Sequence, residues 1–229
     1  MTQIIIPAAG RGSRFNGSEF EKPKPLIEWA GRNMIEHVVQ NFGTEQNSIY
    51  LLCREHHKVD IEGCHIKTID YTTEGPAISA ALFRESIDMD GELIITNCDQ
   101  IILDWDKEAF LRHVRNYDAA LGCFISTAPH NSYVRLDADN HVVEVKEKEV
   151  ISNIATNGLH YWKRAGSFFD SLDEMVRRKD TTNGEYFVAP TYNYLIEKEY
   201  KVGIFMFNRH FPIGTPEQLR KFLKTHGSN

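Results

Sequence analysis

The first 125 residues alternate between two apolar patterns, and this alternation restricts the fold more than any other feature of the chain. Short apolar runs of strand length lie at 4–8, 49–53, 65–69, 92–96 and 119–125. Between them, apolar residues recur at helical spacing within 34–42, 78–82 and 110–114. Strands that alternate with helices predict βαβ units and a mostly parallel α/β sheet with both faces covered by helices.

The second half of the chain has a different pattern. Residues 133–145 alternate around an Asp-Ala-Asp-Asn turn and predict a hairpin, and residues 158–162 predict another strand. Helical patterns follow at 165–178 and 190–197, then a strand at 201–207 and a final helix that Thr215, Pro216 and Glu217 open. We find no repeat or linker, so we expect one continuous domain with a β-rich lid or subdomain.

Composition excludes several classes of protein. The 229 residues carry a net charge of −6, which argues against a nucleic-acid partner because such proteins need a basic surface. No apolar stretch approaches the roughly 20 residues that cross a bilayer, so we expect a cytoplasmic protein without a membrane partner. The 4 cysteines are widely spaced, which predicts free thiols rather than a zinc site. The adjacent His56 and His57 are expected on the surface.

The segment PAAGRGSRF at 7–15 follows the first predicted strand and is rich in small residues. Gly10 and Gly12 supply the start of a dinucleotide fingerprint, but Phe15 stands where the third glycine belongs, and no Gly-Lys-Ser/Thr of a P-loop is present. A turn of this kind still brings backbone N–H groups up to a phosphate. The segment therefore predicts either a phosphate-binding loop or a simple tight turn.

Six short motifs occur in one order along the chain: GRGSRF, KPKPLI, TEGPA at 73–77, NCD at 97–99, EK at 147–148 and GTPE at 214–217. In these motifs the chain resembles the nucleotidylyltransferases that make nucleoside-diphosphate sugars, the NDP-sugar pyrophosphorylases, in a short form that lacks the β-helix domain. The resemblance implies a Rossmann-like fold with a mixed, mostly parallel sheet flanked by helices. Within a single domain over 1–229, it implies an NTP-binding core at about 1–130, an acceptor-binding part at about 131–200, and a C-terminal strand and helix at about 201–229.

The resemblance also implies a reaction and its catalytic residues. A phosphate oxygen of a sugar 1-phosphate attacks the α-phosphorus of an NTP, and pyrophosphate leaves. Because two polyanions react, catalysis consists mainly of charge neutralisation and alignment. In the family, residues matching Arg14, Lys24 and Asp99 do this work: Arg14 stabilises the pyrophosphate, Lys24 bridges the two reacting phosphates, and Asp99 binds the cofactor Mg²⁺.

Two binding sets complete the implied site. The nucleotide-binding set is Ala8, Ala9, Gly10, Arg11, Gly12, Ser13, Asp70, Glu74 and Gly75. The acceptor-binding set is Glu147, Lys148, Asn157, Gly158 and Glu185, with Lys146 as the alternative to Lys148. Asp70 stands where other family members use glutamine for the base; a carboxylate only accepts hydrogen bonds, which favours the amino groups of CTP or GTP.

Three positions depart from the family pattern. Pro212 replaces the aspartate that is a second metal ligand in the family, so Mg²⁺ accepts one carboxylate, or Asp104 or Asp106 substitutes, or catalysis is weak. Val134 replaces a glycine near the sugar, and Pro76 lies near the expected base. The partners we expect are an NTP and a small phosphorylated acceptor, for capsule, lipopolysaccharide or other glycan precursors. A cytidylyltransferase for phosphocholine or a polyol phosphate, and an inactive nucleotide-binding protein, are the alternatives; a homo-oligomer is left open.

Overall fold

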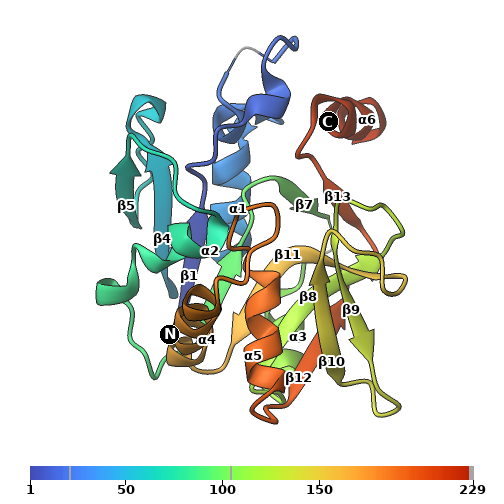
Figure 1. The fold of residues 1–229 in the computed structure, drawn as a ribbon. Helices are drawn as coiled ribbons and strands as arrows, with labels where there is room; N and C mark the ends of the chain where they lie inside the picture. The colour runs from blue at the N-terminus through green and yellow to red at the C-terminus, as the bar shows by residue number, and fades with distance from the viewer. Residues whose placement is uncertain (21, 104, 227–229) are drawn as a thin grey trace.

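A nine-stranded sheet forms the centre of the molecule in a computed structural model that describes residues 1–20, 22–103 and 105–226 (Figure 1). Four neighbouring strands run parallel in the order β5 (Cys64–Ile69), β4 (Asn47–Arg54), β1 (Thr2–Pro7) and β6 (Leu93–Thr96). The antiparallel strand β11 (Ile154–Trp162) pairs with β6 and then with β8 (Ala119–Ile125), and β12 (Val202–Met206) runs parallel to β8 at the edge. The expected mixed, mostly parallel sheet is confirmed.

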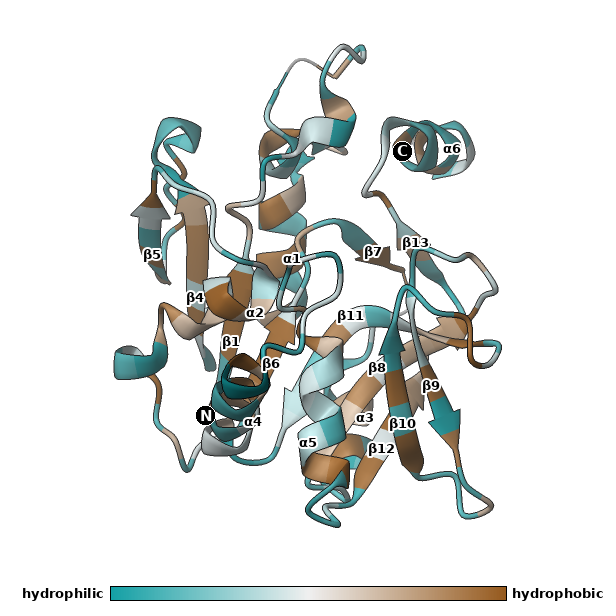
Figure 2. Ribbon diagram, viewed as in Figure 1, coloured by the Kyte–Doolittle hydropathy of each residue, from teal (hydrophilic) through white to brown (hydrophobic). Residues whose placement is uncertain are grey.

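Helices cover both faces of this sheet because alternate strand residues point to opposite sides. Ile5 of β1 belongs to the apolar cluster beneath α2 (Pro76–Ala81), α4 (Ala165–Arg178) and α5 (Tyr192–Ile196). Its neighbours Ile4 and Ile6 belong to the cluster beneath α1 (Met34–Phe42) and α3 (Lys107–Val114). Figure 2 shows the resulting pattern, with apolar strands at the centre and hydrophilic outer faces on the helices.

The predicted hairpin consists of β9 (Ser132–Leu136) and β10 (Val142–Glu147). It extends the central sheet, because Tyr133 of β9 pairs with Ala155 of β11. Helix α5 holds the hairpin in place: the Asn193 side chain accepts a hydrogen bond from the Val145 N–H at 2.9 Å and donates one to the Val145 carbonyl at 2.9 Å. The predicted helix at 190–197 begins as a 3-10 turn at 189–191.

Short elements beyond the central sheet were not expected from the sequence. Strands β2 (Glu28–Trp29) and β3 (Arg32–Asn33) form a small ribbon, and β7 (Gln100–Ile102) pairs with β13 (His210–Pro212). Further 3-10 turns lie at 13–15, 24–26, 55–57 and 84–86. Helix α6 (Pro216–His226) packs Leu219 and Phe222 against the glycine-rich opening segment and lies across from it (Figure 1).

Two further observations concern the described part of the chain. Cys53, Cys98 and Cys123 are buried, Cys64 is half-buried, and all four are free thiols, as expected. Among the described residues, no helix is both long and apolar enough to cross a membrane.

Candidate active site

The carboxyl ends of β1, β4 and β6 meet at one edge of the sheet, where open α/β sheets bind their ligands. After β1, the chain turns through Gly12, whose φ of +62° suits glycine. A Cβ at Gly12 would lie 3.3 Å from the Cβ of Lys24, so the glycine lets the loop pass close to that lysine. Phe15 is buried and anchors the loop, whereas Ser13 and Arg14 are exposed.

Lys24 and Asp99 form an ion pair at this edge, with Lys24 Nζ 2.5 Å from Asp99 Oδ2. Burial would raise the pKa of Asp99, but the ammonium of Lys24 outweighs it and holds that pKa below its usual value. Burial likewise opposes the charge on Lys24, yet Asp99 raises the pKa of the lysine. The positive charge of Arg14 also acts on this pair, so the structure brings the three predicted catalytic residues together.

Strand β13 runs beside the segment that follows Asp99. The Ile213 N–H donates to the Asp99 carbonyl at 2.9 Å, and a Cβ at Gly214 would lie 2.7 Å from Asp99 Oδ2. Pro212 pairs with Gln100, the residue after Asp99. The position that would carry a second metal carboxylate therefore lies close to Asp99 and holds a proline.

No other carboxylate of the described residues takes this role. Asp106 caps helix α3, where its side chain accepts a hydrogen bond from the Ala109 N–H at 2.9 Å, and Asp104 lies outside the described residues. Across 1–20, 22–103 and 105–226 there is no group of three or more histidine, cysteine, aspartate or glutamate side chains that could hold a metal ion. A metal at this edge would have Asp99 as its protein carboxylate.

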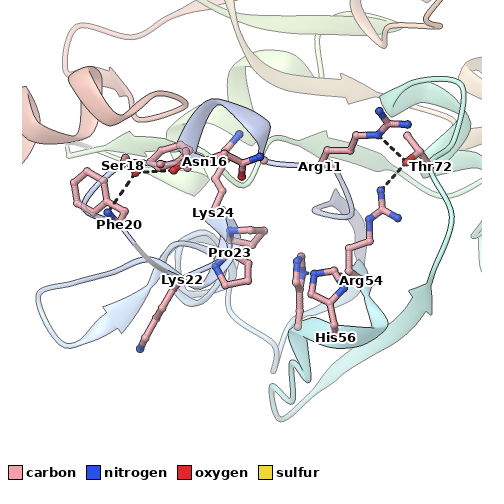
Figure 3. A pocket seen from close by; sticks show the side chains of 16 residues that line it. Arg11, Asn16, Ser18, Phe20, Lys22, Pro23, Lys24, Arg54, His56 and Thr72 are labelled. Carbon is pink, nitrogen blue, oxygen red and sulfur yellow. Dashed lines mark hydrogen bonds between the residues drawn. The ribbon is translucent and has the colours of Figure 1, made fainter.

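A pocket of about 670 Å³ lies between the opening loop and the end of β4 (Figure 3). Of the predicted residues, Gly10, Arg11, Gly12 and Lys24 line it. The other basic or histidine side chains on its walls are Lys22, Arg54, His56 and His57. This concentration of positive charge suits a polyphosphate.

Arg54 was not expected from the sequence to belong to the site. It lies at the end of β4 and is only 8% exposed. Its guanidinium donates to the Ala9 carbonyl at 2.7 Å, the Asp70 carbonyl at 3.1 Å, the Tyr71 carbonyl at 2.8 Å and Thr72 Oγ1 at 2.9 Å. The one available signal was a charged residue directly after the apolar run 49–53. That signal does not reveal which distant segments the side chain joins.

The expectation that both adjacent histidines are on the surface is wrong for His57, which is buried. Its Nδ1 accepts a hydrogen bond from the Arg54 backbone N–H at 3.4 Å. Burial lowers the pKa of His57 to about 4, so the ring is neutral near pH 7 and can accept that bond.

The turn after β5 carries the remaining predicted nucleotide contacts. Asp70 and Glu74 are exposed, and Gly75 has a φ of +125°. A Cβ at Gly75 would lie 2.5 Å from the Tyr186 carbonyl, so only glycine fits. The Tyr186 N–H donates to the Glu74 carbonyl at 2.8 Å, and the Ala77 N–H donates to the Tyr186 carbonyl at 3.0 Å. These bonds hold the turn against the segment that contains Glu185.

Three of the predicted acceptor residues lie near one another. Glu147 accepts a hydrogen bond from Ser132, and burial raises its pKa despite that bond and the nearby charge of Lys148. The charge of exposed Glu185 also acts on Glu147. Lys148, with a φ of +57°, places Nζ 4.1 Å from the centre of the Phe187 ring. The alternative residue, Lys146, instead lies 3.8 Å from Glu144.

Asn157 and Gly158 connect β11 to the sheet edge that carries Asp99. The Asn97 N–H, two residues before Asp99, donates to the Gly158 carbonyl at 3.2 Å. Gly158 has a φ of +84°, and a Cβ there would collide with the Asn97 side chain. Asn157 is buried, and its Oδ1 accepts a hydrogen bond from the Leu159 N–H at 3.0 Å. These two residues therefore brace the strand end that presents Asp99.

The chain is similar in sequence to one protein family and to several longer proteins. The family described as MobA-like NTP transferase domain matches residues 4–155. The bifunctional protein GlmU of Methanococcus maripaludis strain S2 is 26% identical over 224 residues, which cover 93% of this chain and 51% of that protein. GlmU of Methanocaldococcus jannaschii is 26% identical over 227 residues, with the same coverage of 93% and 51%. The chain thus spans about half the length of the curated relatives it matches.

Two solved structures share the fold. A nucleoside-diphosphate-sugar pyrophosphorylase from Vibrio cholerae RC9 superposes with a TM-score of 0.83 at 22% identity, covering 96% of this chain and 99% of that one. A putative glucose-1-phosphate thymidylyltransferase from Bacillus anthracis, solved in complex with sucrose, gives a TM-score of 0.80 at 17% identity, covering 100% of this chain and 96% of that one. At these identities the likeness is one of fold.

Proposed function

Because the chain belongs to the family of MobA-like NTP transferase domains, we propose that it transfers a nucleoside monophosphate from an NTP to a sugar 1-phosphate. The products are a nucleoside-diphosphate sugar and pyrophosphate. The nucleotidyltransferase family and the Rossmann-like fold expected from the sequence motifs are confirmed. The name of the nucleoside-diphosphate-sugar pyrophosphorylase from Vibrio cholerae supports this choice of reaction.

One observation carries the proposal: the partly buried ion pair of Lys24 and Asp99 beside a glycine-rich loop and a cation-lined pocket. Attack of one phosphate on another requires cations at the reacting centre, since both reactants are anionic. Lys24 is already charged and held at this centre by Asp99. A phosphate oxygen that takes the place of the Asp99 carboxylate would therefore meet an ammonium that needs no reorganisation.

The remaining residues have roles that follow from their positions. The amides from Gly10 to Ser13 receive the triphosphate, and Arg14 faces the charge that develops on the departing pyrophosphate. On the acceptor side, Glu147 accepts a hydrogen bond from a sugar hydroxyl and Lys148 neutralises the acceptor phosphate. Glu185 is free for a second hydroxyl, since it lies in a turn after Thr182 rather than at a helix start.

The residues at this edge fit a Mg²⁺ ion that is shared with the nucleotide. Mg²⁺ commonly binds through one or two carboxylates and completes its coordination with phosphate oxygens and water. Asp99 is ionised and is the carboxylate available at this edge, which fits a metal that arrives with the NTP. When bound, the ion would neutralise negative charge on the phosphates.

Two main-chain hydrogen bonds near the phosphate loop bear on which base the site would accept. The Ala8 N–H already donates to the Leu52 carbonyl at 2.8 Å, and the Ala9 carbonyl accepts from Arg54 at 2.7 Å. The Ala8 N–H is therefore engaged, whereas the Ala9 carbonyl keeps a second lone pair that could accept from an amino group of the base. The exposed carboxylate of Asp70 is then the polar side chain we assign to the base, which favours the amino groups of CTP or GTP. We assign the product to the supply of precursors for capsule, lipopolysaccharide or other glycans.

The proposal is tested by pyrophosphate release from each of the four common NTPs in the presence of Mg²⁺. Acceptors are a panel of sugar 1-phosphates, phosphocholine and polyol phosphates, and the control omits the acceptor. The highest kcat/KM with a sugar 1-phosphate is the expected result. A preference for a non-sugar phosphate would instead indicate the cytidylyltransferase alternative. No release from any pair, while an NTP still raises the Tm, would indicate a nucleotide-binding protein.

A further inference from the structure

We propose that Arg54 is a positioning residue for the nucleotide: it fixes the spacing between the phosphate loop and the turn after β5. The inference rests on the proposed function, because it concerns the same nucleotide site. Arg54 ends β4, the strand between β1 and β5, so its side chain lies between the segments that follow those two strands. No contact of Arg54 with substrate is required for this role.

The hydrogen bonds of Arg54 join segments that are far apart in the sequence. Its Nε donates to the Ala9 carbonyl at the start of the phosphate loop, at 2.7 Å. Its Nη1 and Nη2 donate to the carbonyls of Asp70 and Tyr71 and to Thr72 Oγ1, at 2.8 to 3.1 Å. The planar guanidinium directs its donors along fixed directions, so four bonds from one group set the separation of the two segments.

The environment of Arg54 indicates that geometry, rather than ion pairing, is its purpose. The side chain is 8% exposed, and every acceptor of its guanidinium in the described part of the chain is a neutral carbonyl or hydroxyl. A buried charge is costly unless it is hydrogen-bonded, and Arg54 donates four hydrogen bonds to uncharged partners.

Thr72 receives a second arginine, which strengthens the connection. Arg11 Nε donates to Thr72 Oγ1 at 3.1 Å, and Arg54 Nη2 donates to the same oxygen at 2.9 Å (Figure 3). The phosphate loop is thus attached to the turn through both Ala9 and Arg11. Because this spacing exists before any ligand arrives, the NTP does not have to order the two segments when it binds.

The consequence is a specific kinetic signature. In Arg54→Ala, the NTP must order the loop and the turn itself, so we expect the Kd and KM for NTP to rise about tenfold to a hundredfold. The kcat should change less than about threefold, since ground state and transition state lose the same interaction. Arg54→Lys should retain most of the defect, because one ammonium cannot reach acceptors on both segments. Added guanidinium ion should restore much of the affinity of Arg54→Ala.

The control variant is Arg84→Ala, which removes another arginine that joins distant segments by hydrogen bonds but has a 39% exposed side chain and does not line the pocket. Arg84 Nη2 donates to the Phe169 carbonyl at 3.1 Å and to Asp173 Oδ1 at 2.7 Å. We expect Arg84→Ala to lower the Tm and leave the KM for NTP unchanged. If Arg54→Ala behaves in the same way, Arg54 is merely structural and the proposal is wrong.

Two readouts separate this inference from the proposed function. NTP affinity by calorimetry and amide hydrogen exchange of residues 8–12 and 70–75 both report on the unreacted enzyme. We expect Arg54→Ala to speed exchange in these two segments and Arg84→Ala to leave them unchanged; unchanged exchange in Arg54→Ala would overturn the proposal. Absence of turnover in the unmodified protein would instead contradict the proposed function. The hydrogen-exchange and calorimetric results would still test the role of Arg54, because they do not depend on turnover.

Discussion

At the scale of single residues, the site is organised around charges that neutralise one another before a substrate binds. Lys24 and Asp99 are each about one-fifth exposed, at 19% and 22% of the side chain, and each keeps the other ionised. In the function that we propose, substrate phosphates would replace Asp99 at Lys24, and a metal would replace Lys24 at Asp99. The charges that a reaction between anions requires would then be in place before the substrates bind.

Asp99→Asn should lower kcat at least about a hundredfold, equivalent to about 2.7 kcal/mol of barrier, because it removes the metal ligand and frees Lys24 from its partner. Pyrophosphate release is the measurement. The matched control is Glu92→Gln, at the other end of β6, where the carboxylate accepts from Arg115 at 2.7 Å. That variant should lose stability and keep its activity; equal losses of activity in both variants would contradict the assignment of Asp99.

Arg14→Ala should lower kcat about a hundredfold while NTP affinity falls much less, since its charge acts on the Lys24–Asp99 pair and, in the function that we propose, on the departing pyrophosphate. Arg11→Ala is the comparison, because Arg11 is bonded to Thr72 instead. We expect Arg11→Ala to change the KM for NTP more than kcat. Steady-state kinetics of both variants decide the matter, and a normal kcat in Arg14→Ala would remove Arg14 from the reaction.

The raised pKa of Glu147 predicts a pH dependence of stability. Burial favours the protonated carboxyl in the folded state, so the group contributes stability below its usual pKa of 4.5, and this contribution is lost as the pH rises through the raised value. Glu147→Gln removes the loss. The Tm of Glu147→Gln relative to the unmodified protein should therefore increase from pH 4.5 toward neutral pH, as measured by thermal unfolding.

Glu144→Gln, on the same strand β10, is the control for this effect. A constant difference in Tm between Glu147→Gln and the unmodified protein across that pH range would show that Glu147 does not have the raised pKa. Binding of the acceptor should weaken in Glu147→Gln, because an amide is a poorer acceptor for a sugar hydroxyl than a carboxylate.

At the scale of elements, the segment that follows β13 passes close to Asp99. A Cβ at Gly214 would lie 2.7 Å from Asp99 Oδ2, the oxygen that contacts Lys24. Gly214→Ala should therefore displace the carboxylate and lower kcat about tenfold to a hundredfold, with a smaller effect on the Tm. Pyrophosphate release and thermal unfolding are the measurements.

Pro212→Ala tests the same strand without crowding Asp99. Because Pro212 cannot supply a metal ligand, we expect kcat to stay within about threefold of the unmodified protein. Normal activity in Gly214→Ala, or a large loss in Pro212→Ala, would show that β13 acts in some other way.

The helices and strands that the sequence predicted are long enough to show a regular spacing of apolar residues. The helices at 34–42 and 165–178 have apolar residues at helical spacing, and the structure places them within those ranges. Strands β7 and β13 have three residues each, too few for a pattern, and they exist because Gln100 and Pro212 are brought together from distant parts of the chain. Their pairing also explains why Pro212 lies beside the catalytic edge.

Among the residues of the candidate site, those in the six sequence motifs could be proposed from the sequence, and Arg54 could not. Its role depends on Ala9, Asp70 and Thr72, which come near it only when β1, β4 and β5 lie side by side. The close contact of the Glu74 and Tyr186 main chains is likewise a property of the fold rather than of either motif. The motifs therefore predict which side chains are candidates for the site, whereas the strand order of the sheet determines which of them lie close together.

At the scale of the whole molecule, the central sheet positions most parts of the candidate site, and the separate pairing of β7 with β13 adds the segment beside Asp99. The first part of the chain supplies strands β1, β4, β5 and β6 of the central sheet. The middle of the chain supplies β8, β11 and the β9–β10 hairpin, and the last part supplies β12. Strand β11 pairs with β6 on one side and β8 on the other, so the acceptor residues and Asp99 belong to one continuous framework. The placement of β11 was not predictable, because the sequence of a strand that is buried along nearly its whole length does not specify which strands it pairs with.

The central claim is that an acceptor phosphate attacks the α-phosphorus of an NTP, and phosphorus NMR of the complete reaction tests it most directly. With NTP, Mg²⁺ and a sugar 1-phosphate, we expect inorganic pyrophosphate and the paired resonances of a new diphosphate ester to appear in equal amounts, and neither to form when EDTA removes the metal. Nucleoside monophosphate with pyrophosphate, or nucleoside diphosphate with inorganic phosphate, would show hydrolysis in place of transfer and would contradict the account.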